Sequence, residues 1–350
     1  MSCEKTSCKK GGIIVIGATG FIGMYTIRQL IAEGRKVYAT GRNKQLGAVL
    51  EDMGAEFIEL DITCEKDYEK LPTENIDGVI LLAGLLPANA TADLEENENA
   101  ADYFEVNVIG TIKVLEFCRK NKIKKLISNS SYSDVAGAWR KGYAIKETEP
   151  RDFHFTGDHA VYVISKNAAC DVMEYYNQQH NMQCAWFRFP PVYGVGPHSV
   201  IYVNGKYYKS GVQTFIENAQ QGNDIEIWGD PHITRDIIYV KDVAKAYCMA
   251  LDSDKTRGLY NMTSGTELDL EDQVKAIIEV FGDPDNRSSI VYRPDKPNNT
   301  PSFLFDMSKA KEDFGFVPQY TSYIDMMKDY KDELESGKWD ELVNSRKKEQ

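Results

Sequence analysis

The sequence has few of the features that mark secreted, disulfide-bonded or membrane-spanning proteins. Its seven cysteines are scattered without a C-x-x-C pair, and its five histidines have no metal-like spacing. We therefore expect neither a disulfide framework nor a metal site. The first ten residues lack the apolar core of a secretory signal, and the longest apolar stretch, VILLAGLL at 79–86, is too short to cross a bilayer. These absences predict a cytoplasmic protein that does not bind membranes.

A strong positive charge is also lacking. Lys and Arg number 41 against 53 Asp and Glu, which gives a net charge of −12 and argues against non-specific nucleic-acid binding. An anionic ligand must then be held by local geometry. The 350 residues, of which 42% are hydrophobic and 27% charged, suit one large domain or two joined ones.

Strand-like and helix-like segments alternate through the first half of the chain. Short β-like runs are expected at 13–17, 36–42, 56–62, 77–84 and 124–131. Helices are expected from about 21 to 33, from 102 to 120 and from 161 to 180. This alternation is typical of a parallel sheet with helices on both faces, so we predict an α/β protein with a Rossmann-type doubly wound parallel sheet.

The second half is less regular and predicts a smaller mixed lobe. A hairpin is expected around the Asn-Gly of IYVNGKYY at 201–208. Helices are expected from a cap at Asp242 and over 268–282, with a loop over 283–301. We predict a dinucleotide-binding domain over 11–190 with returning segments at about 234–262, a C-terminal substrate lobe from 191–233 and 263–335, and mobile tails at 1–10 and 336–350.

The stretch GATGFIG at 17–23 places three glycines between a strand and a helix. Glycines are needed where the strand turns tightly, where backbone approaches a pyrophosphate and where the helix packs on the strand. The helix N-terminus offers free N–H groups to phosphate. The alternative is a glycine-rich turn without a ligand, but the setting favours nucleotide binding. The predicted contacts here are Gly17, Thr19, Gly20, Phe21, Ile22 and Gly23.

The end of the second strand decides which nucleotide fits. NAD-binding proteins commonly place an acidic residue there for the ribose 2′-hydroxyl, whereas this chain has Gly41-Arg42. An arginine can pair with a 2′-phosphate, so the cofactor is predicted as NAD(P) with a preference for NADP. The alternative is a solvated Arg42. Asp61, at the end of the third strand, can accept from the adenine amine or cap the surface.

Tyr162 and Lys166 lie four residues apart in YVISK. On a helix they share a face, so the ammonium can lower the pKa of the phenol, which then serves as a general base. The same spacing occurs at Tyr202–Lys206 and Tyr292–Lys296, but the first straddles the Asn-Gly hairpin and the second contains a proline. Only Tyr162–Lys166 has a helical context, which favours a catalytic pair over a structural one.

GATGFIG together with YVISK resembles the extended short-chain dehydrogenase/reductases, specifically the NAD(P)-dependent epimerase/dehydratase family. Further similar motifs, in the family's order, are LLAG (81–84), VNVIGT (106–111), RFPPVYGVGP (188–197), TRDIIYVKDVAKAY (234–247) and DMSKAKEDFGF (306–316). The resemblance implies a nicotinamide cofactor, a Tyr base, a Lys that also holds the nicotinamide ribose and a Ser or Thr on the preceding strand. It further implies cofactor contacts at Ile62, Leu82, Ala83, Gly84, Pro191 and Val192.

The hydroxyl residue of this family is ambiguous here. Counting from KKLI places it at Ser131, whereas counting back from Val135 lands on Tyr132. We favour Ser131 because the strand fixes its position. Ser133 is a further alternative, and a polar strand end without a catalytic role is another. Tyr132 and Ser133 are then expected to contact substrate.

Departures from the family pattern narrow the reaction. The 4,6-dehydratases follow the hydroxyl residue with Asp-Glu, whereas only Asp134 is acidic in SSYSDVAG, which disfavours dehydration. Nucleotide-sugar epimerases often carry Asn where this chain has Pro191. Arg235 matches the family's phosphate-binding arginine, with Arg293 as a second candidate, although an arginine beside Asp236 can equally form an ion pair.

Two enzymatic interpretations follow. In a sugar or nucleotide-sugar epimerase, Tyr162 takes a hydroxyl proton, a retained NAD takes the hydride and the keto intermediate rebinds on its other face. In an NADPH-dependent carbonyl reductase, Tyr162 supplies the proton. The resemblance favours the epimerase and Arg42 the reductase. A non-catalytic NAD(P)-binding regulator is the alternative of another class, although such proteins typically lack the Tyr–Lys pair. Family members commonly pair two long helices into a four-helix bundle, so we expect a homodimer through 102–120 and the Tyr162 helix.

Overall fold

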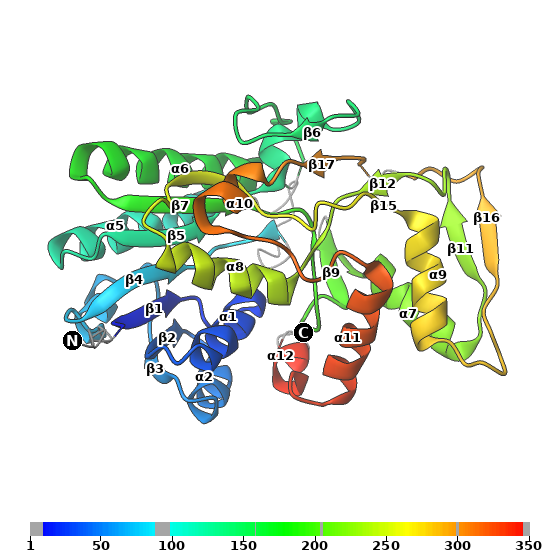
Figure 1. The fold of residues 1–350 in the computed structure, drawn as a ribbon, viewed down its shortest axis with the longest axis horizontal. Helices are drawn as coiled ribbons and strands as arrows, with labels where there is room; N and C mark the ends of the chain where they lie inside the picture. The colour runs from blue at the N-terminus through cyan, green and yellow to red at the C-terminus, as the bar shows by residue number, and fades with distance from the viewer. Residues whose placement is uncertain (1–9, 88–98, 158, 204–205, 299–300, 346–350) are drawn as a thin grey trace, which may run out of the picture.

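A seven-stranded parallel sheet forms the centre of the molecule (Figure 1). The computed structural model describes residues 10–87, 99–157, 159–203, 206–298 and 301–345. The strands follow the order β14-β7-β5-β4-β1-β2-β3, and every neighbouring pair is parallel. They are β1 Gly12–Ile16, β2 Val37–Gly41, β3 Glu56–Glu59, β4 Ile76–Leu81, β5 Lys125–Asn129, β7 Gln183–Arg188 and β14 Gly258–Asn261. The doubly wound Rossmann-type fold is confirmed.

Helices cover both faces of this sheet. One face carries α1 Phe21–Ala32, α2 Lys44–Asp52 and α8 Val240–Asp252. The other carries α5 Gly110–Lys120 and α6 Ala160–His180, with α4 Ala100–Phe104 and a π-helical stretch Glu105–Ile109 leading into α5. Successive side chains of a strand point to opposite faces, so Ile13 and Val15 join the first core while Ile14 and Ile16 join the second.

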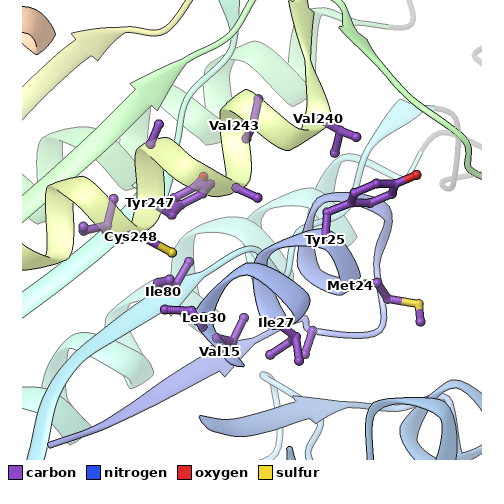
Figure 2. Packing of buried hydrophobic residues seen from close by; sticks show 14 of the residues in the cluster. Val15, Met24, Tyr25, Ile27, Leu30, Ile80, Val240, Val243, Tyr247 and Cys248 are labelled. Atoms are coloured by element: carbon purple, nitrogen blue, oxygen red, sulfur yellow. The ribbon is translucent and has the colours of Figure 1, made fainter. Parts of the chain in front are cut away.

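The core on the first face lies between β1, α1 and α8. Figure 2 shows Ile27 and Leu30 of α1 close to Val15, with Val243 and Tyr247 projecting from α8 above. All five side chains are fully or almost fully buried. α8 belongs to the second half of the sequence, so this core fixes a returning segment against β1 and α1.

The rest of the chain builds a lobe of helices and short two-stranded sheets. Its helices are α7 Gly211–Gln221, α9 Leu270–Phe281 and α11 Tyr323–Glu335. Its strands are β9 Val200–Val203, β10 Lys206–Lys209, β11 Ile225–Trp228, β12 Thr234–Arg235, β15 Leu268–Asp269 and β16 Ile290–Arg293. Joining pieces are β6 Ala144–Ile145, β8 Val192–Tyr193, β13 Ile238–Tyr239, β17 Leu304–Phe305, α10 Ser308–Phe314, α12 Asp340–Asn344 and the 3₁₀ helices Glu65–Lys70 and Tyr132–Ala138. The exact domain boundaries stay a prediction.

The predicted elements of the second half are confirmed in part. β9 and β10 pair antiparallel, which confirms the hairpin, although Asn204 and Gly205 lie outside the described residues. α9 confirms the helix expected over 268–282, and the Asp269 side chain caps it. The loop expected at 283–301 is wrong in part, because β16 pairs in parallel with β11.

The predicted cap at Asp242 is wrong. α8 begins at Val240, and Asp242 lies in its first turn, where its carboxylate accepts from the Gln319 and Tyr320 amides. The charge of this carboxylate therefore stabilises a loop that precedes α11. Sequence spacing alone does not show such a distant partner.

The mobile tail expected from residue 336 is also wrong over 336–345. This segment contains α12, and the Trp339 side chain is only 1% exposed. Residues 1–9 and 346–350 of the predicted tails lie outside the described residues.

The metal and disulfide chemistry of the described residues is limited. No group of three or more metal-ligating side chains occurs in it, and Cys64, Cys118, Cys170, Cys184 and Cys248 are free. Across the same residues, none of the helices combines the length and apolar character needed to traverse a bilayer.

Candidate functional site

A cleft of about 1270 Å³ runs along the carboxyl ends of the central strands. β2 and β3 follow on one side of β1 in the sheet, whereas β4 lies on the other side of β1, so the order of the strands reverses at β1. Loops diverge at such a reversal, and ligands of doubly wound folds bind in the crevice that results. Gly17 after β1, Arg42 after β2 and Leu82 after β4 all line this cleft.

The glycine turn forms the floor of the cleft. Gly17 has a φ of 88°, and a Cβ there would lie 2.3 Å from the Ala83 amide nitrogen. A Cβ on Gly23 would lie 2.5 Å from the Gly17 carbonyl oxygen, so only glycine lets α1 pack this closely on the turn. α1 begins at Phe21, and the N–H groups of its first turn have no partner within the helix. This arrangement fits a pyrophosphate.

The polar side chains at the end of β2 and β3 contact each other. The Arg42 guanidinium lies 3.6 Å from the Asp61 carboxylate, and the Arg42 side chain is 79% exposed. Asp61 also accepts from the backbone and hydroxyl of Thr63 at 2.9 and 2.7 Å. Although partial burial raises the pKa of Asp61, the bonds from Thr63 and the charge of Arg42 bring it below its usual value. Arg42 therefore lines the cleft with the Asp61 carboxylate beside it.

Tyr162 and Lys166 line the same cleft from the first two turns of α6. Burial raises the pKa of Tyr162, with further increases from Tyr132 and Tyr103, and burial lowers the pKa of Lys166. The Lys166 ammonium donates to Asn129 Oδ1 at 3.2 Å, which ties it to the end of β5. The predicted Tyr–Lys pair thus shares a cavity with the glycine turn.

The three candidates for the hydroxyl position lie together after β5. Ser131 is buried, and its hydroxyl accepts from the Ser133 amide at 3.3 Å at the start of a 3₁₀ helix. The Tyr132 ring packs between Trp139 and Phe303 at centroid distances of 5.5 and 5.4 Å. The lining of the cleft does not include Ser131, Tyr132 or Ser133.

The two predicted phosphate arginines are far from equivalent. Arg235 is half-buried beneath the Tyr193 hydroxyl, and its buried Nε has no hydrogen-bond partner among the described residues. Arg235 also lowers the pKa of Tyr132, which burial otherwise raises. Arg293 lies on β16, at the end of the lobe away from β1 in Figure 1, and pairs with Glu226 and Asp295. The structure does not bring Arg293 to the cleft.

The acid predicted to pair with Arg235 has other partners. Asp236 is fully buried and accepts from the Thr263 hydroxyl and the Phe305 amide. Among the residues that the structure describes, the guanidinium of Arg235 therefore has no carboxylate partner, unlike that of Arg293. Its positive charge and its orphaned Nε make it the stronger of the two candidates for an anion.

Most of the predicted cofactor contacts line the cleft. They are Gly17, Thr19, Gly20, Phe21, Ile22, Gly23, Arg42, Asp61, Ile62, Leu82, Ala83, Gly84, Tyr162, Lys166 and Val192. Pro191 is missing from the lining; its carbonyl accepts from the Ile238 amide at 3.1 Å and so joins β8 to β13.

The sequence analysis missed several residues of the cleft. Asn129 had a usable signal, because it is polar and ends a buried strand at the edge where ligands bind. Asn107 is not in the lining, but it holds the backbone of the lining residue Leu85 through both ends of its amide and also bonds Ser165 of α6. His198, Tyr207, Leu342 and Ser345 line the cleft from distant segments, and nothing in their local sequence indicates this.

Comparison with known proteins agrees with this geometry. A model of the NAD dependent epimerase/dehydratase family matches residues 13–263. The chain belongs to this family. The resemblance predicted from the sequence motifs is confirmed, and with it membership of a family of enzymes.

Curated relatives match most of this chain at low sequence identity. A putative UDP-glucose 4-epimerase of Methanocaldococcus jannaschii is 26% identical over 317 residues, covering 88% of this chain and 93% of that protein. A dTDP-4-dehydro-6-deoxy-D-allose reductase of Streptomyces bikiniensis is 27% identical and covers 88% and 91%. A human dTDP-D-glucose 4,6-dehydratase is 26% identical and covers 82% and 80%. Because a dehydratase is among them, the comparisons do not support the exclusion of dehydration.

Solved structures confirm the fold. UDP-glucose 4-epimerase of Thermotoga maritima with UDP-glucose has a TM-score of 0.74 at 24% identity and covers 93% of this chain and 99% of that one. UDP-glucose 4-epimerase of Thermus thermophilus in complex with NAD has a TM-score of 0.69 at 22% identity and covers 91% and 98%.

Proposed function

We propose that this protein is an NAD(P)-dependent nucleotide-sugar epimerase-type oxidoreductase that uses Tyr162 as its acid–base group. One observation carries the proposal: Tyr162 and Lys166 line the same cleft as the glycine turn. The turn has the close backbone approach that a dinucleotide requires, as the short Cβ distances at Gly17 and Gly23 indicate. A group that moves a proton therefore stands within the space that fits a nicotinamide cofactor.

The residues of this chain divide the work in the following way. The Tyr162 hydroxyl accepts the proton of a sugar hydroxyl during oxidation and returns it during reduction. Burial and the neighbouring tyrosines raise the pKa of Tyr162 in this structure. We assign to the Lys166 ammonium, held by Asn129, the role of stabilising the Tyr162 phenolate when the reaction forms it. Ser131, two residues after the end of β5, is the proposed third member of the site and supplies a second hydroxyl beside that of Tyr162. The bound nicotinamide supplies the acceptor and donor of hydride.

A nucleotide-sugar is the substrate class that best matches the residues near Tyr162. Arg235 offers a partly buried cation with an orphaned Nε, which suits a diphosphate. Relatives named for UDP- and dTDP-sugars support the same substrate class. Arg293 is omitted from this proposal because Glu226 and Asp295 already neutralise it.

A carbonyl reductase of the same family is the second candidate. Arg42 at the end of β2 favours it, because a reductase that exchanges NADPH benefits from a cation beside the 2′-phosphate. The similarity to a Streptomyces protein named as a dTDP-sugar reductase supports this candidate. Tyr162 would then give its proton to the alkoxide that forms on the substrate.

Dehydration is the least favoured reaction in our proposal. Asp134, the only acid in SSYSDVAG, is buried and forms a 2.7 Å ion pair with Arg188. A carboxylate so engaged is a poor acid or base for elimination. The dehydratase among the relatives makes this a point for direct assay.

For the cofactor, we propose that NAD and NADP bind with similar strength. Arg42 attracts a 2′-phosphate, but the charged Asp61 carboxylate 3.6 Å away repels it. Known structures of similar fold were solved with NAD, which supports NAD as one occupant. The preference for NADP expected from Arg42 alone is thus reduced by its neighbour.

We further propose that two copies pair through α5 and α6. Both helices lie at the edge of the molecule in Figure 1, and Phe104, Ile109 and Tyr175 on or beside them are 40%, 39% and 55% exposed. Large apolar side chains grouped on one surface are typical of subunit contacts. Light scattering at micromolar concentration is expected to give twice the 39.6 kDa chain mass; the mass of one chain would refute the dimer.

The proposed function is tested by releasing and weighing any nucleotide that co-purifies with the protein. Retained NAD supports the epimerase. A nucleotide-free protein that takes up NADPH and oxidises it with a 4-keto nucleotide-sugar supports the reductase. A protein that binds cofactor tightly but transfers no hydride to or from any nucleotide-sugar would be a regulator and would refute both.

A further inference from the structure

The last helix of the chain returns from the C-terminal lobe to the nucleotide-binding half. α11 packs against α9 in the lobe, whereas α12 lies beside α1 and α2, as the red and blue ribbons of Figure 1 show. Leu342 of α12 and Ser345 just after it line the cleft together with Asn43 and Leu46. Leu342 and Ser345 therefore belong to a wall of the cleft that also contains Arg42 and Asn43.

A buried aromatic stack holds this wall in place. The Trp339 ring lies on the Tyr25 ring of α1, with centroids 4.0 Å apart and planes 20° apart. The guanidinium of Arg28 covers the same indole at 5.6 Å. Tyr25 in turn donates to the Val195 carbonyl at 3.1 Å, which links the stack to the loop after β8.

A buried carboxylate fixes the turn that leads into α12. Glu333, 6% exposed near the end of α11, pairs with Arg28 at 3.0 Å and with Lys241 of α8 at 2.9 Å. These two partners come from helices that both pack on the central sheet. Removing either cation would leave the buried Glu333 carboxylate with one partner fewer, which is costly. These ion pairs therefore hold the end of α11 in one position against the sheet domain.

We propose that residues 342–345 are a cofactor-binding element that closes the dinucleotide cleft at the adenosine end. The reasoning rests on the proposed function. Arg42 and Asn43 end β2, where this fold holds the adenosine ribose. Leu342 is almost fully buried, so its side chain supports this part of the lining from the core side. The Ser345 hydroxyl donates to the Leu342 carbonyl at 2.7 Å, which ties Ser345 to the helix.

Two consequences follow from such a wall. A dinucleotide that packs against α12 must stabilise the helix, because binding to the folded form only favours that form. A bulky side chain at Ser345 must narrow the cleft and weaken binding. Asp340 offers a matched control, since it is exposed on the same short helix and does not line the cleft.

The test compares full-length wild type, Ser345→Trp and Asp340→Trp, each freed of nucleotide. Calorimetry with NAD and NADP is expected to show at least about tenfold weaker binding for Ser345→Trp and a change within about twofold for Asp340→Trp. Hydrogen exchange of the wild type is expected to slow at the Val343 amide, which donates to the Trp339 carbonyl at 2.8 Å, when cofactor is added.

Equal affinities of the two tryptophan variants, with Val343 exchange unchanged by cofactor, would overturn the inference while leaving the proposed function intact. A wild type that binds neither NAD nor NADP would instead overturn the proposed function, and this inference with it. Melting temperatures of the nucleotide-free variants separate a local effect from loss of fold.

Discussion

The two sides of the cleft are built in contrasting ways. The nucleotide side is a turn of seven residues, Gly17 to Gly23, in which backbone shape sets the site. The proposed substrate side involves Tyr162, which lines the cleft, together with Ser131 and Arg235, which lie outside its lining and come from separate segments. A backbone cradle is local in sequence, so its pattern can be read directly. A side-chain site assembled from distant segments requires the fold.

The largest expected effect concerns the substrate side. Tyr162→Phe removes the hydroxyl that moves the proton, so turnover is expected to fall by roughly a thousandfold or more. The ring and its burial are preserved, so cofactor affinity is expected to stay within about threefold of the wild-type value. Steady-state kinetics and calorimetry measure the two quantities. A variant with half the wild-type turnover would remove Tyr162 from the chemistry.

The next effect concerns the nucleotide side. In Gly23→Ala, the added Cβ would lie 2.5 Å from the Gly17 carbonyl oxygen and 2.6 Å from that of Ala18, so the turn must open. NAD affinity is expected to fall by roughly a hundredfold, or about 2.7 kcal/mol. Gly211→Ala is the control, because no atom lies within 4 Å of its added Cβ. Similar affinities for the two variants would show that the turn does not hold the cofactor.

The two arginines give a matched comparison within the lobe. Arg235→Met removes an unneutralised cation and is expected to raise the KM for a nucleotide-sugar by roughly 10- to 100-fold, with a smaller change in kcat. Arg293→Met removes an exposed partner of Glu226 and Asp295 and should leave KM within about twofold. An Arg293 effect as large as that of Arg235 would mean that β16 reaches the substrate.

The smallest effect concerns cofactor choice. Asp61→Asn keeps an oxygen for the Thr63 bonds but removes the charge beside Arg42, so the affinity ratio of NADP to NAD is expected to rise by roughly three- to tenfold. Arg42→Asp is expected to shift the ratio toward NAD by at least as much. Calorimetric titrations with both cofactors measure these ratios, and variants with the wild-type ratio would place the 2′ position elsewhere.

The sequence predicts the features that depend on short-range patterns and misses those that depend on partners distant in the chain. The alternation of strands and helices predicts the sheet, and the glycine spacing predicts the cradle, because both patterns are short-range. The tail expected from residue 336 is wrong because Trp339 is buried against Tyr25, a partner more than three hundred residues away. The same limit explains why Arg235 and Arg293 look alike in sequence, although only the structure shows that Arg293 has acidic partners.

Single-turnover reduction of bound cofactor tests the central claim most directly. NAD-loaded protein is mixed with UDP- and dTDP-hexoses, and the absorbance of reduced nicotinamide is followed in wild type and Tyr162→Phe. We predict a rise in the wild type with at least one nucleotide-sugar and none in the variant. Absence of any rise with NAD, together with no NADPH oxidation by 4-keto nucleotide-sugars, would contradict the account, as would an equal signal in both proteins.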